Sequence, residues 1–107
     1  MTTSKQPLAA TRKGEVLRLQ PKVDLVASTV EAQRGAMMKA LEGWTGPVLL
    51  DLSRVDQIDS LGITLVLGLF KSCQKAGTPF SIEGVKPDIL RVFRLFNLPK
   101  FFSILEA

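Results

Sequence analysis

The sequence predicts an α/β fold: a mixed sheet of four to five strands with helices packed mainly on one face. Strand-like apolar runs and helix-like apolar periods follow each other in the order β-β-α-β-α-β-α. The links between them are short, as in one folded unit. With 107 residues, 46% of them hydrophobic, the chain can build one core. We expect a flexible tail at residues 1–6 and a single domain at residues 7–107.

Two strands open the predicted domain. A weak strand is expected over residues 7–11 and a stronger one over residues 15–20, where Leu17 and Leu19 alternate with polar side chains as in a half-buried strand. Pro21 should end the second strand, because proline has no N–H group for a sheet hydrogen bond.

A helix and a central strand follow. The apolar residues between positions 25 and 41 recur at helical spacing: Val26, Val30, Met37 and Leu41. Gly43 is a plausible stop for this helix. The short apolar run Val48–Leu52 lies between two helical segments, which is typical of a buried central strand.

The second helix is expected over residues 60–76, ending at Gly77. Its predicted core stripe has six members: Leu61, Leu65, Val66, Leu69, Phe70 and Cys73. Ile63 and Leu67 fall on roughly the opposite side, so the helix is apolar nearly all round. Such surplus apolar surface indicates either burial on several sides or a surface for a partner.

The C-terminal third predicts a strand over residues 80–83, closed by Gly84, and then a third helix beginning near Pro87. Four side chains form the expected inward face of that helix: Ile89, Val92, Phe93 and Phe96. Asn97 is a reasonable C-terminal cap. Four residues beyond it should return to the core: Phe101, Phe102, Ile104 and Leu105.

The composition argues against several function classes. The chain has no histidine and one cysteine, Cys73, so no internal disulfide, Cys/His metal cluster or Ser-His triad is possible. On the core stripe, Cys73 is expected to be a small buried hydrophobe rather than a redox thiol. No stretch approaches the roughly 18 apolar residues of a membrane span, and no signal peptide is visible. We expect a cytoplasmic protein that is not an enzyme and uses no cofactor and no metal.

The net charge of +4 does not predict nucleic-acid binding. The 14 lysines and arginines are scattered along the chain, and tyrosine, a common stacking residue, is absent. A solvated surface with a mild excess of positive charge explains the composition better.

Asp59-Ser60-Leu61-Gly62 is the segment most indicative of function. It stands where a buried strand gives way to a helix, and a helix start offers unpaired N–H groups and a partial positive charge. Either Asp59 or Ser60 could simply cap the helix. A phosphate on Ser60 would be tolerated there and would add negative charge to a partner-facing surface. Gly62 would let another backbone approach closely.

The stretch from Val48 to Ile104 resembles the STAS domain, the fold of bacterial anti-sigma factor antagonists and of the cytoplasmic tails of sulfate transporters. The matching pieces are Val48–Ser53, Ile58–Ile63, Gly77 and Arg94–Leu98. Leu17–Asp24 resembles the first hairpin of that family, with Pro21 where the family prefers glycine. Including the hairpin, the likeness covers about residues 8 to 105.

This resemblance implies a regulatory binding protein, acting in transcription regulation, that docks an anti-sigma factor or a switch serine kinase through the start of the second helix. The implied partner-binding residues are Asp24, Asp59, Ser60, Leu61, Gly62 and Ile63. Antagonists switched by phosphorylation often carry Ser or Thr immediately before the glycine, where this chain has Leu61. Any phosphoprotein form would therefore depend on Ser60.

A second interpretation stays open. The runs Asp51–Val55, Asp59–Gly62 and Phe96–Pro99 also resemble the small cytoplasmic STAS subunit of bacterial ABC lipid transporters. That subunit binds the ABC ATPase with the same helix start and needs no phosphorylation. Leu61 fits this interpretation slightly better, whereas the apolar segment 98–102 fits the antagonists better. Nothing in the sequence decides the oligomeric state.

Overall fold

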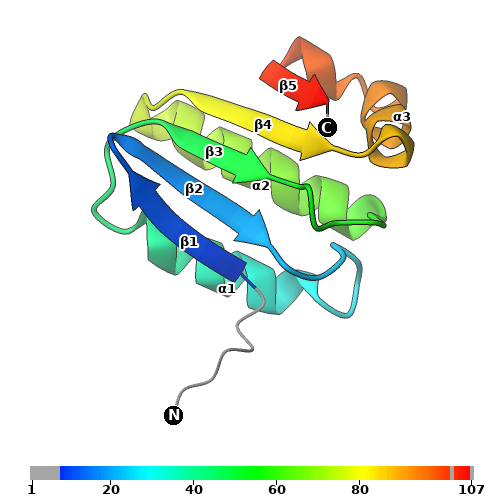
Figure 1. Cartoon of the computed structure of the whole chain (residues 1–107), viewed down its shortest axis with the longest axis horizontal. Helices are drawn as coiled ribbons and strands as arrows, with labels where there is room; N and C mark the ends of the chain where they lie inside the picture. Colours follow the sequence, from blue (N-terminus) through cyan, green and yellow to red (C-terminus); the bar gives the residue numbers. More distant parts are fainter. Residues whose placement is uncertain (1–7, 102, 107) are drawn as a thin grey trace.

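The computed structural model describes residues 8–101 and 103–106, so the predicted tail at residues 1–6 lies outside the described part. Within that part, five strands form one sheet in the order β1-β2-β3-β4-β5 (Figure 1). The strands are β1 (Leu8–Lys13), β2 (Val16–Pro21), β3 (Val48–Asp51), β4 (Phe80–Val85) and β5 (Ser103–Glu106). The helices are α1 (Val30–Leu41), α2 (Ser60–Ala76) and α3 (Pro87–Leu95), followed by the 3-10 helix η1 (Leu98–Lys100).

The order of the strands explains why the helices gather on one side. β1 and β2 pair antiparallel, and β2, β3, β4 and β5 pair parallel in succession. Because each parallel connection moves one strand in the same direction, right-handed crossovers place their helices on the same face. Figure 1 shows α1 and α2 together behind the sheet. The predicted mixed sheet with helices mainly on one face is confirmed.

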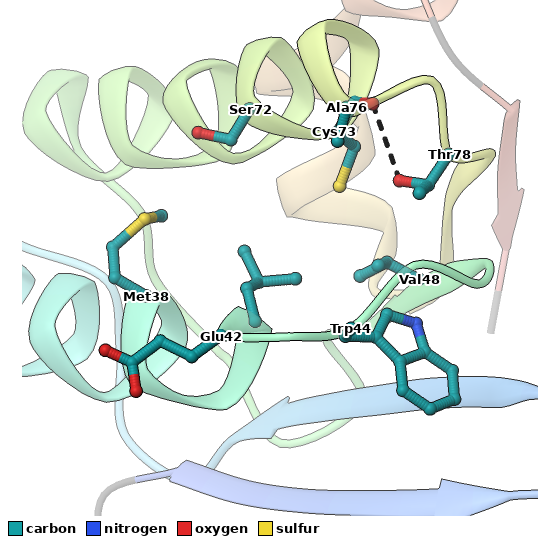
Figure 2. A pocket seen from close by; sticks show the side chains of 9 residues that line it. Met38, Glu42, Trp44, Val48, Ser72, Cys73, Ala76 and Thr78 are labelled. Atoms are coloured by element: carbon teal, nitrogen blue, oxygen red, sulfur yellow. Dashed lines mark hydrogen bonds between the residues drawn. The ribbon is translucent and has the colours of Figure 1, made fainter.

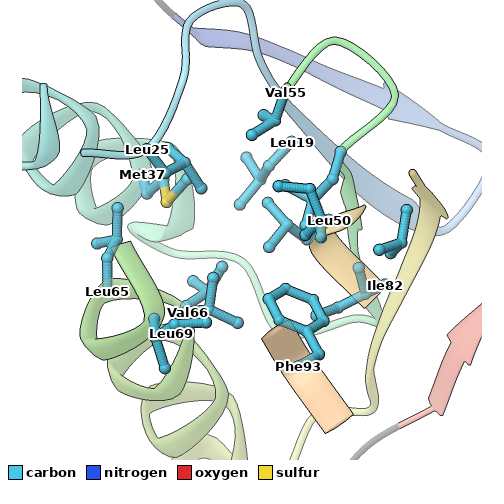
Figure 3. Packing of buried hydrophobic residues seen from close by; sticks show 14 of the residues in the cluster. Leu19, Leu25, Met37, Leu50, Val55, Leu65, Val66, Leu69, Ile82 and Phe93 are labelled. Carbon is cyan, nitrogen blue, oxygen red and sulfur yellow. The ribbon is translucent and has the colours of Figure 1, made fainter. Parts of the chain in front are cut away.

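The core lies between the sheet and these helices. Leu19, Leu50 and Ile82 occupy neighbouring strands in register, and none of the three is exposed. Figure 3 shows Val66 of α2 and Phe93 of α3 converging on this row. Burying each such side chain contributes about 1.5–3 kcal/mol.

The boundaries of α2 agree with the prediction, but α1 begins five residues later than expected. Leu25 forms an isolated parallel bridge with Ile58, so its backbone is part of a strand pairing. The Oγ1 of Thr29 accepts a hydrogen bond from the Val26 N–H at 3.1 Å, which stabilises a turn before the helix begins at Val30.

The structure reverses the prediction for two residues of α2: Leu61 was assigned to the core stripe and Ile63 to the side away from it. Leu61 is 47% exposed, whereas Ile63 is only 3% exposed and belongs to the core. Leu67 follows Ile63 on the same side of the helix at i, i+4 spacing and lies in a groove lined also by Phe96 and Leu98. The C-terminal segment therefore lies along this side of α2 and leaves a groove between the two.

The C-terminal predictions were also partly wrong. Strand β4 does not close at Gly84 but continues to Val85. Phe96 and Phe101 are about half exposed instead of lying in the core. Ile104 packs against the core as expected. Two further predictions fall outside the described residues: Phe102 as a whole and the side chain of Leu105.

The face of the sheet without helices carries a polar network centred on Asp51. This carboxylate is 2% exposed and accepts hydrogen bonds from Arg18 at 2.6 Å, from Gln20 at 2.8 Å and from the Ser53 N–H at 2.9 Å. Arg18 also contacts Glu83 at 2.8 Å, so it links three strands. Burial alone would raise the pKa of Asp51, but these hydrogen bonds outweigh it and keep the pKa below its usual value.

Gly84 makes room for this network. A Cβ atom at Gly84, where φ is +73°, would lie 2.9 Å from the Asp51 Oδ1 and 3.0 Å from the Ser53 Cβ. We expect Gly84→Ala to lower the free energy of unfolding by about 2–4 kcal/mol, the sum of backbone strain and crowding. Urea unfolding would measure it.

Gly43→Ala is the matched control for this prediction. Gly43 has nearly the same φ, +72°, but nothing lies within 4 Å of its added Cβ. This variant should lose only the backbone contribution of about 1–2 kcal/mol. Equal losses in the two variants would show that the crowding against Asp51 and Ser53 is unimportant.

Candidate functional site

Asp59 is the N-cap of α2, and its carboxylate joins the helix to a second loop. Its Oδ1 accepts hydrogen bonds from the N–H groups of Leu61 at 2.9 Å and Gly62 at 3.0 Å. Its Oδ2 accepts one from the Ala27 N–H at 2.9 Å. The donors at Gly62, Ala27 and Leu61 hold the pKa of Asp59 below its usual value, because they favour the ionised form. Asp59, rather than Ser60, is therefore the cap.

Asp24 makes the reciprocal connection. Its Oδ1 accepts hydrogen bonds from the N–H groups of Asp56 at 2.8 Å and Gln57 at 3.2 Å. Each of the two loops, one after β2 and one after β3, thus supplies a carboxylate to the main chain of the other. The loops are fastened on both sides of their crossing.

Leu25 lies between these two carboxylate contacts and adds main-chain bonds. Its N–H donates to the Gln57 carbonyl at 3.1 Å, and its carbonyl accepts from the Asp59 N–H at 3.1 Å. Its side chain is fully buried. The start of α2 is therefore held by a short piece of strand pairing as well as by two carboxylates.

Gly62 permits this crossing. A Cβ atom at Gly62 would lie 2.1 Å from the Leu25 carbonyl oxygen and 2.6 Å from the Ile58 Cγ1. The backbone that approaches Gly62 is thus the chain's own. No other residue type fits at this position without moving the loop.

The six predicted partner-binding residues take three different positions. Asp24 and Asp59 hold the loops together, as described above. Gly62 and Ile63 are buried within the domain. Ser60 and Leu61 are exposed at the surface, and the described part of the chain offers no hydrogen bond to the Ser60 hydroxyl. Of the six, Ser60 and Leu61 are therefore the two whose side chains are most open to solvent.

The sequence prediction missed the roles of Leu25, Ala27 and Gln57. All three contribute through main-chain N–H or carbonyl groups, which every residue type possesses. Their side chains therefore carried no signal. Asp24, which directly precedes the buried Leu25, was the one sequence feature that pointed to this loop.

A cavity of about 240 Å³ lies between the C-terminal ends of α1 and α2, away from this site (Figure 2). Cys73 points into it, and the Thr78 hydroxyl donates a hydrogen bond to the Cys73 carbonyl at 3.4 Å. The thiol residue is 3% exposed, and burial raises the pKa of Cys73. The burial confirms the prediction that Cys73 packs as a small buried hydrophobe.

Residues 8–101 and 103–106 contain neither a metal-binding cluster nor a membrane-spanning helix. No three His, Cys, Asp or Glu side chains there gather closely enough to hold a metal ion. None of the helices in the same part has the length and apolar content to cross a membrane. Near the site, Asp56 is paired with Lys86.

The fold, with its capped helix start at the ends of parallel strands, defines a protein class. The chain belongs to the STAS domain family, whose family model matches residues 7–107. Proteins of this family are in general regulatory or binding proteins rather than enzymes, and they act through protein–protein contacts.

Particular relatives are similar in sequence over part of their length. The chain is 34% identical over 58 residues to the intermembrane phospholipid transport system binding protein MlaB of Escherichia coli strain K12, and equally to that of Shigella flexneri. The match covers 54% of this chain and 60% of each relative.

Solved structures are similar in fold. A candidate anti-sigma factor antagonist of Thermotoga maritima superposes with a TM-score of 0.86 at 22% identity, over 94% of this chain and 86% of that one. The anti-sigma factor antagonist SpoIIAA, in its unphosphorylated form, superposes with a TM-score of 0.70 at 19% identity, over 94% and 88%. At these identities the likeness shows the fold alone.

Substituting Gly62 tests the crossing of the loops. We expect Gly62→Ala to lower the free energy of unfolding by about 3 kcal/mol or more, because its Cβ would meet backbone atoms that cannot rotate away. In the same helix, Gly68→Ala is the control, since nothing lies within 4 Å of its added Cβ. It should stabilise the protein by about 0.5–1 kcal/mol. Urea unfolding would measure both, and equal stability of Gly62→Ala and Gly68→Ala would contradict the close approach of the Leu25 carbonyl to Gly62.

The pH dependence of stability tests the cap. Because the folded-state pKa of Asp59 is lowered, its ionised form stabilises the fold above the unfolded-state value of about 3.9. This contribution is lost as the pH falls through the folded-state pKa. We therefore expect the wild type to be more stable than Asp59→Asn above about pH 5, with the difference shrinking below about pH 4. Thermal unfolding across this range would refute the role if the difference stayed constant.

Proposed function

We propose that this chain is the STAS subunit of a bacterial ABC system for phospholipid transport, and that it binds the ATPase of that system through the start of α2. The observation that carries the proposal is Leu61, an apolar side chain 47% exposed beside exposed Ser60 on a fixed frame. An exposed apolar residue on a rigid element is suited to binding a partner, because little conformational entropy is lost when the partner covers it. The proposal includes a cytoplasmic location, where the ATPase lies.

The sequence likeness supports this function over the alternative. The relatives at 34% identity are binding proteins of an intermembrane phospholipid transport system. The likeness to antagonists, in contrast, is at 22% identity or less among the structures described above. Leu61 itself agrees with a subunit that binds without a phosphorylation switch.

An anti-sigma factor antagonist, binding an anti-sigma factor or a switch serine kinase, is the second candidate. The exposed Ser60 hydroxyl favours it, because a kinase could reach that atom. The structure also alters what a phosphate would do there. Two N–H groups at the helix start already donate to Asp59, so a phosphate on Ser60 would lie beside a carboxylate and not in a vacant anion site. Its charge would act mainly by repelling a partner.

Charge introduced at Leu61 tests the docking surface. We expect Leu61→Asp to weaken binding of the phospholipid-transport ATPase from the same genome at least about tenfold, because an ionised carboxylate would be buried without a partner. Ala32→Asp, which adds the same charge at an exposed position of α1, should leave the affinity unchanged. Co-expression with the ATPase, followed by affinity purification and titration calorimetry, would measure both.

The same purification separates the two candidate functions. Recovery of a serine kinase in place of the ATPase, with incorporation of phosphate that Ser60→Ala abolishes, would reject the transport subunit and support the antagonist. Loss of binding in Ala32→Asp equal to that in Leu61→Asp would show that the contact is not at the start of α2.

A further inference from the structure

We propose a second docking surface, separate from the start of α2: a groove between the C-terminal half of α2 and the segment from α3 to η1 that binds an acidic amphipathic helix of a protein partner. The groove encloses about 390 Å³. It is lined by Leu67, Phe70, Lys71, Gln74, Phe96, Leu98 and Phe101. This surface goes beyond the proposed function and does not depend on which partner binds at Leu61.

The walls of the groove are apolar and already in place. Phe70 contacts Phe101 and Phe80 with ring centroids 6.2 Å apart in both pairs, in tilted geometry. Leu98 is almost fully buried and anchors η1 beneath the groove. A preformed apolar hollow with aromatic walls can accept a large side chain without first rearranging.

Exposed apolar surface is concentrated beside this groove. Within the described part of the chain, five large hydrophobic residues are exposed, and three of them fall in one seven-residue segment: Leu95 at 76%, Phe96 at 50% and Phe101 at 53%. Scattered exposed apolar residues need no explanation, but such a cluster marks an interaction surface.

The charge around the groove selects the occupant. The two segments that form it, residues 67–76 and 94–101, contain four basic residues and no Asp or Glu: Lys71, Lys75, Arg94 and Lys100. Lys71 lines the groove, and Lys100 stands between the lining residues Leu98 and Phe101. An apolar groove with Lys71 in its lining, formed by two segments of net positive charge, is complementary to a helix that has apolar anchors on one face and carboxylates on the other.

A helix fits this surface better than a membrane does. A membrane-binding surface presents protruding apolar side chains, whereas five of the lining residues enclose a hollow between two elements: Leu67, Phe70, Phe96, Leu98 and Phe101. An amphipathic helix places anchors at i, i+3, i+4 and i+7, so that one or two of them can enter such a hollow.

The test is a titration of the complete, isotopically labelled chain followed by two-dimensional NMR. The probe is a helical peptide of about 14 residues, or four turns, with Leu and Phe on one face and Glu elsewhere. A second peptide carries Lys in place of each Glu. A third probe is vesicles of phosphatidylglycerol. We expect the acidic peptide to shift the resonances of Leu67, Phe70 and Phe101, and the basic peptide and the vesicles to leave them unchanged.

Matched variants locate the binding. Lys71→Glu should lower the affinity for the acidic peptide about fivefold or more. Lys39→Glu, the same change at an exposed position of α1, should leave that affinity unchanged. Leu61→Asp should leave peptide binding intact, which separates this surface from the proposed function. The proposal is overturned if no peptide binds, if the basic peptide binds equally well, if the vesicles bind in place of the peptide, or if Lys71→Glu has no effect.

Discussion

The crossing of the loop after β2 over the start of α2 is the constraint on which the exposed surface depends. At the crossing, the carbonyl of Leu25 accepts from Asp59, and Gly62 leaves the space that this approach needs. Asp24 and Asp59 then fasten the two loops in opposite directions, each carboxylate accepting from the main chain of the other loop. The main-chain donors of both loops thereby gain charged acceptors, which make stronger hydrogen bonds than neutral ones. Ser60 and Leu61 are presented by this arrangement and not by a flexible loop.

The face of the sheet without helices is also organised by hydrogen bonds to a carboxylate, in this case that of Asp51. α1 and α2 lie on one side of the sheet, and within the described residues neither of them covers the other side (Figure 1). Asp51 lies there almost fully buried, and its carboxylate accepts hydrogen bonds from Arg18 and Gln20 of β2 and from the Ser53 N–H. A buried charge without partners would be strongly destabilising, whereas a fully satisfied one can fix the register of β2 against β3 and β4.

Hydrophobic periodicity, together with the residues that end helices and strands, was enough to predict the architecture. Three local signals agree with the observed elements: the alternation of Leu17 and Leu19, the apolar run at Val48 and the helix stop at Gly77. The predictions failed where distant segments decide the outcome. Ile63 is buried and Leu61 is exposed because of how α2 packs in the folded domain, and the periodicity within the helix does not contain this information.

The candidate site was predictable in the same uneven way. The strand-to-helix position of Asp59 and Gly62 could be predicted, because a cap and a close approach restrict residue type. Their partners could not, since Leu25, Ala27 and Gln57 act through main-chain groups. The exposure of Leu61 could not be predicted either, because a leucine at the edge of a helical apolar stripe gives the same sequence pattern whether it is buried or exposed.

The Asp59 cap also affects which end of α2 is suited to an anionic partner. A helix N-terminus ordinarily attracts anions, but here Asp59 already accepts from two of its N–H donors, so the contact proposed at that end would depend on shape and apolar area. Lys71 and Lys75 lie toward the other end, where cations stabilise the negative end of the helix dipole. The surface of the helix suited to an anionic partner is therefore displaced to its C-terminal half. Seventeen residues span about 25 Å, enough to keep an apolar contact at one end and a charged contact at the other physically separate.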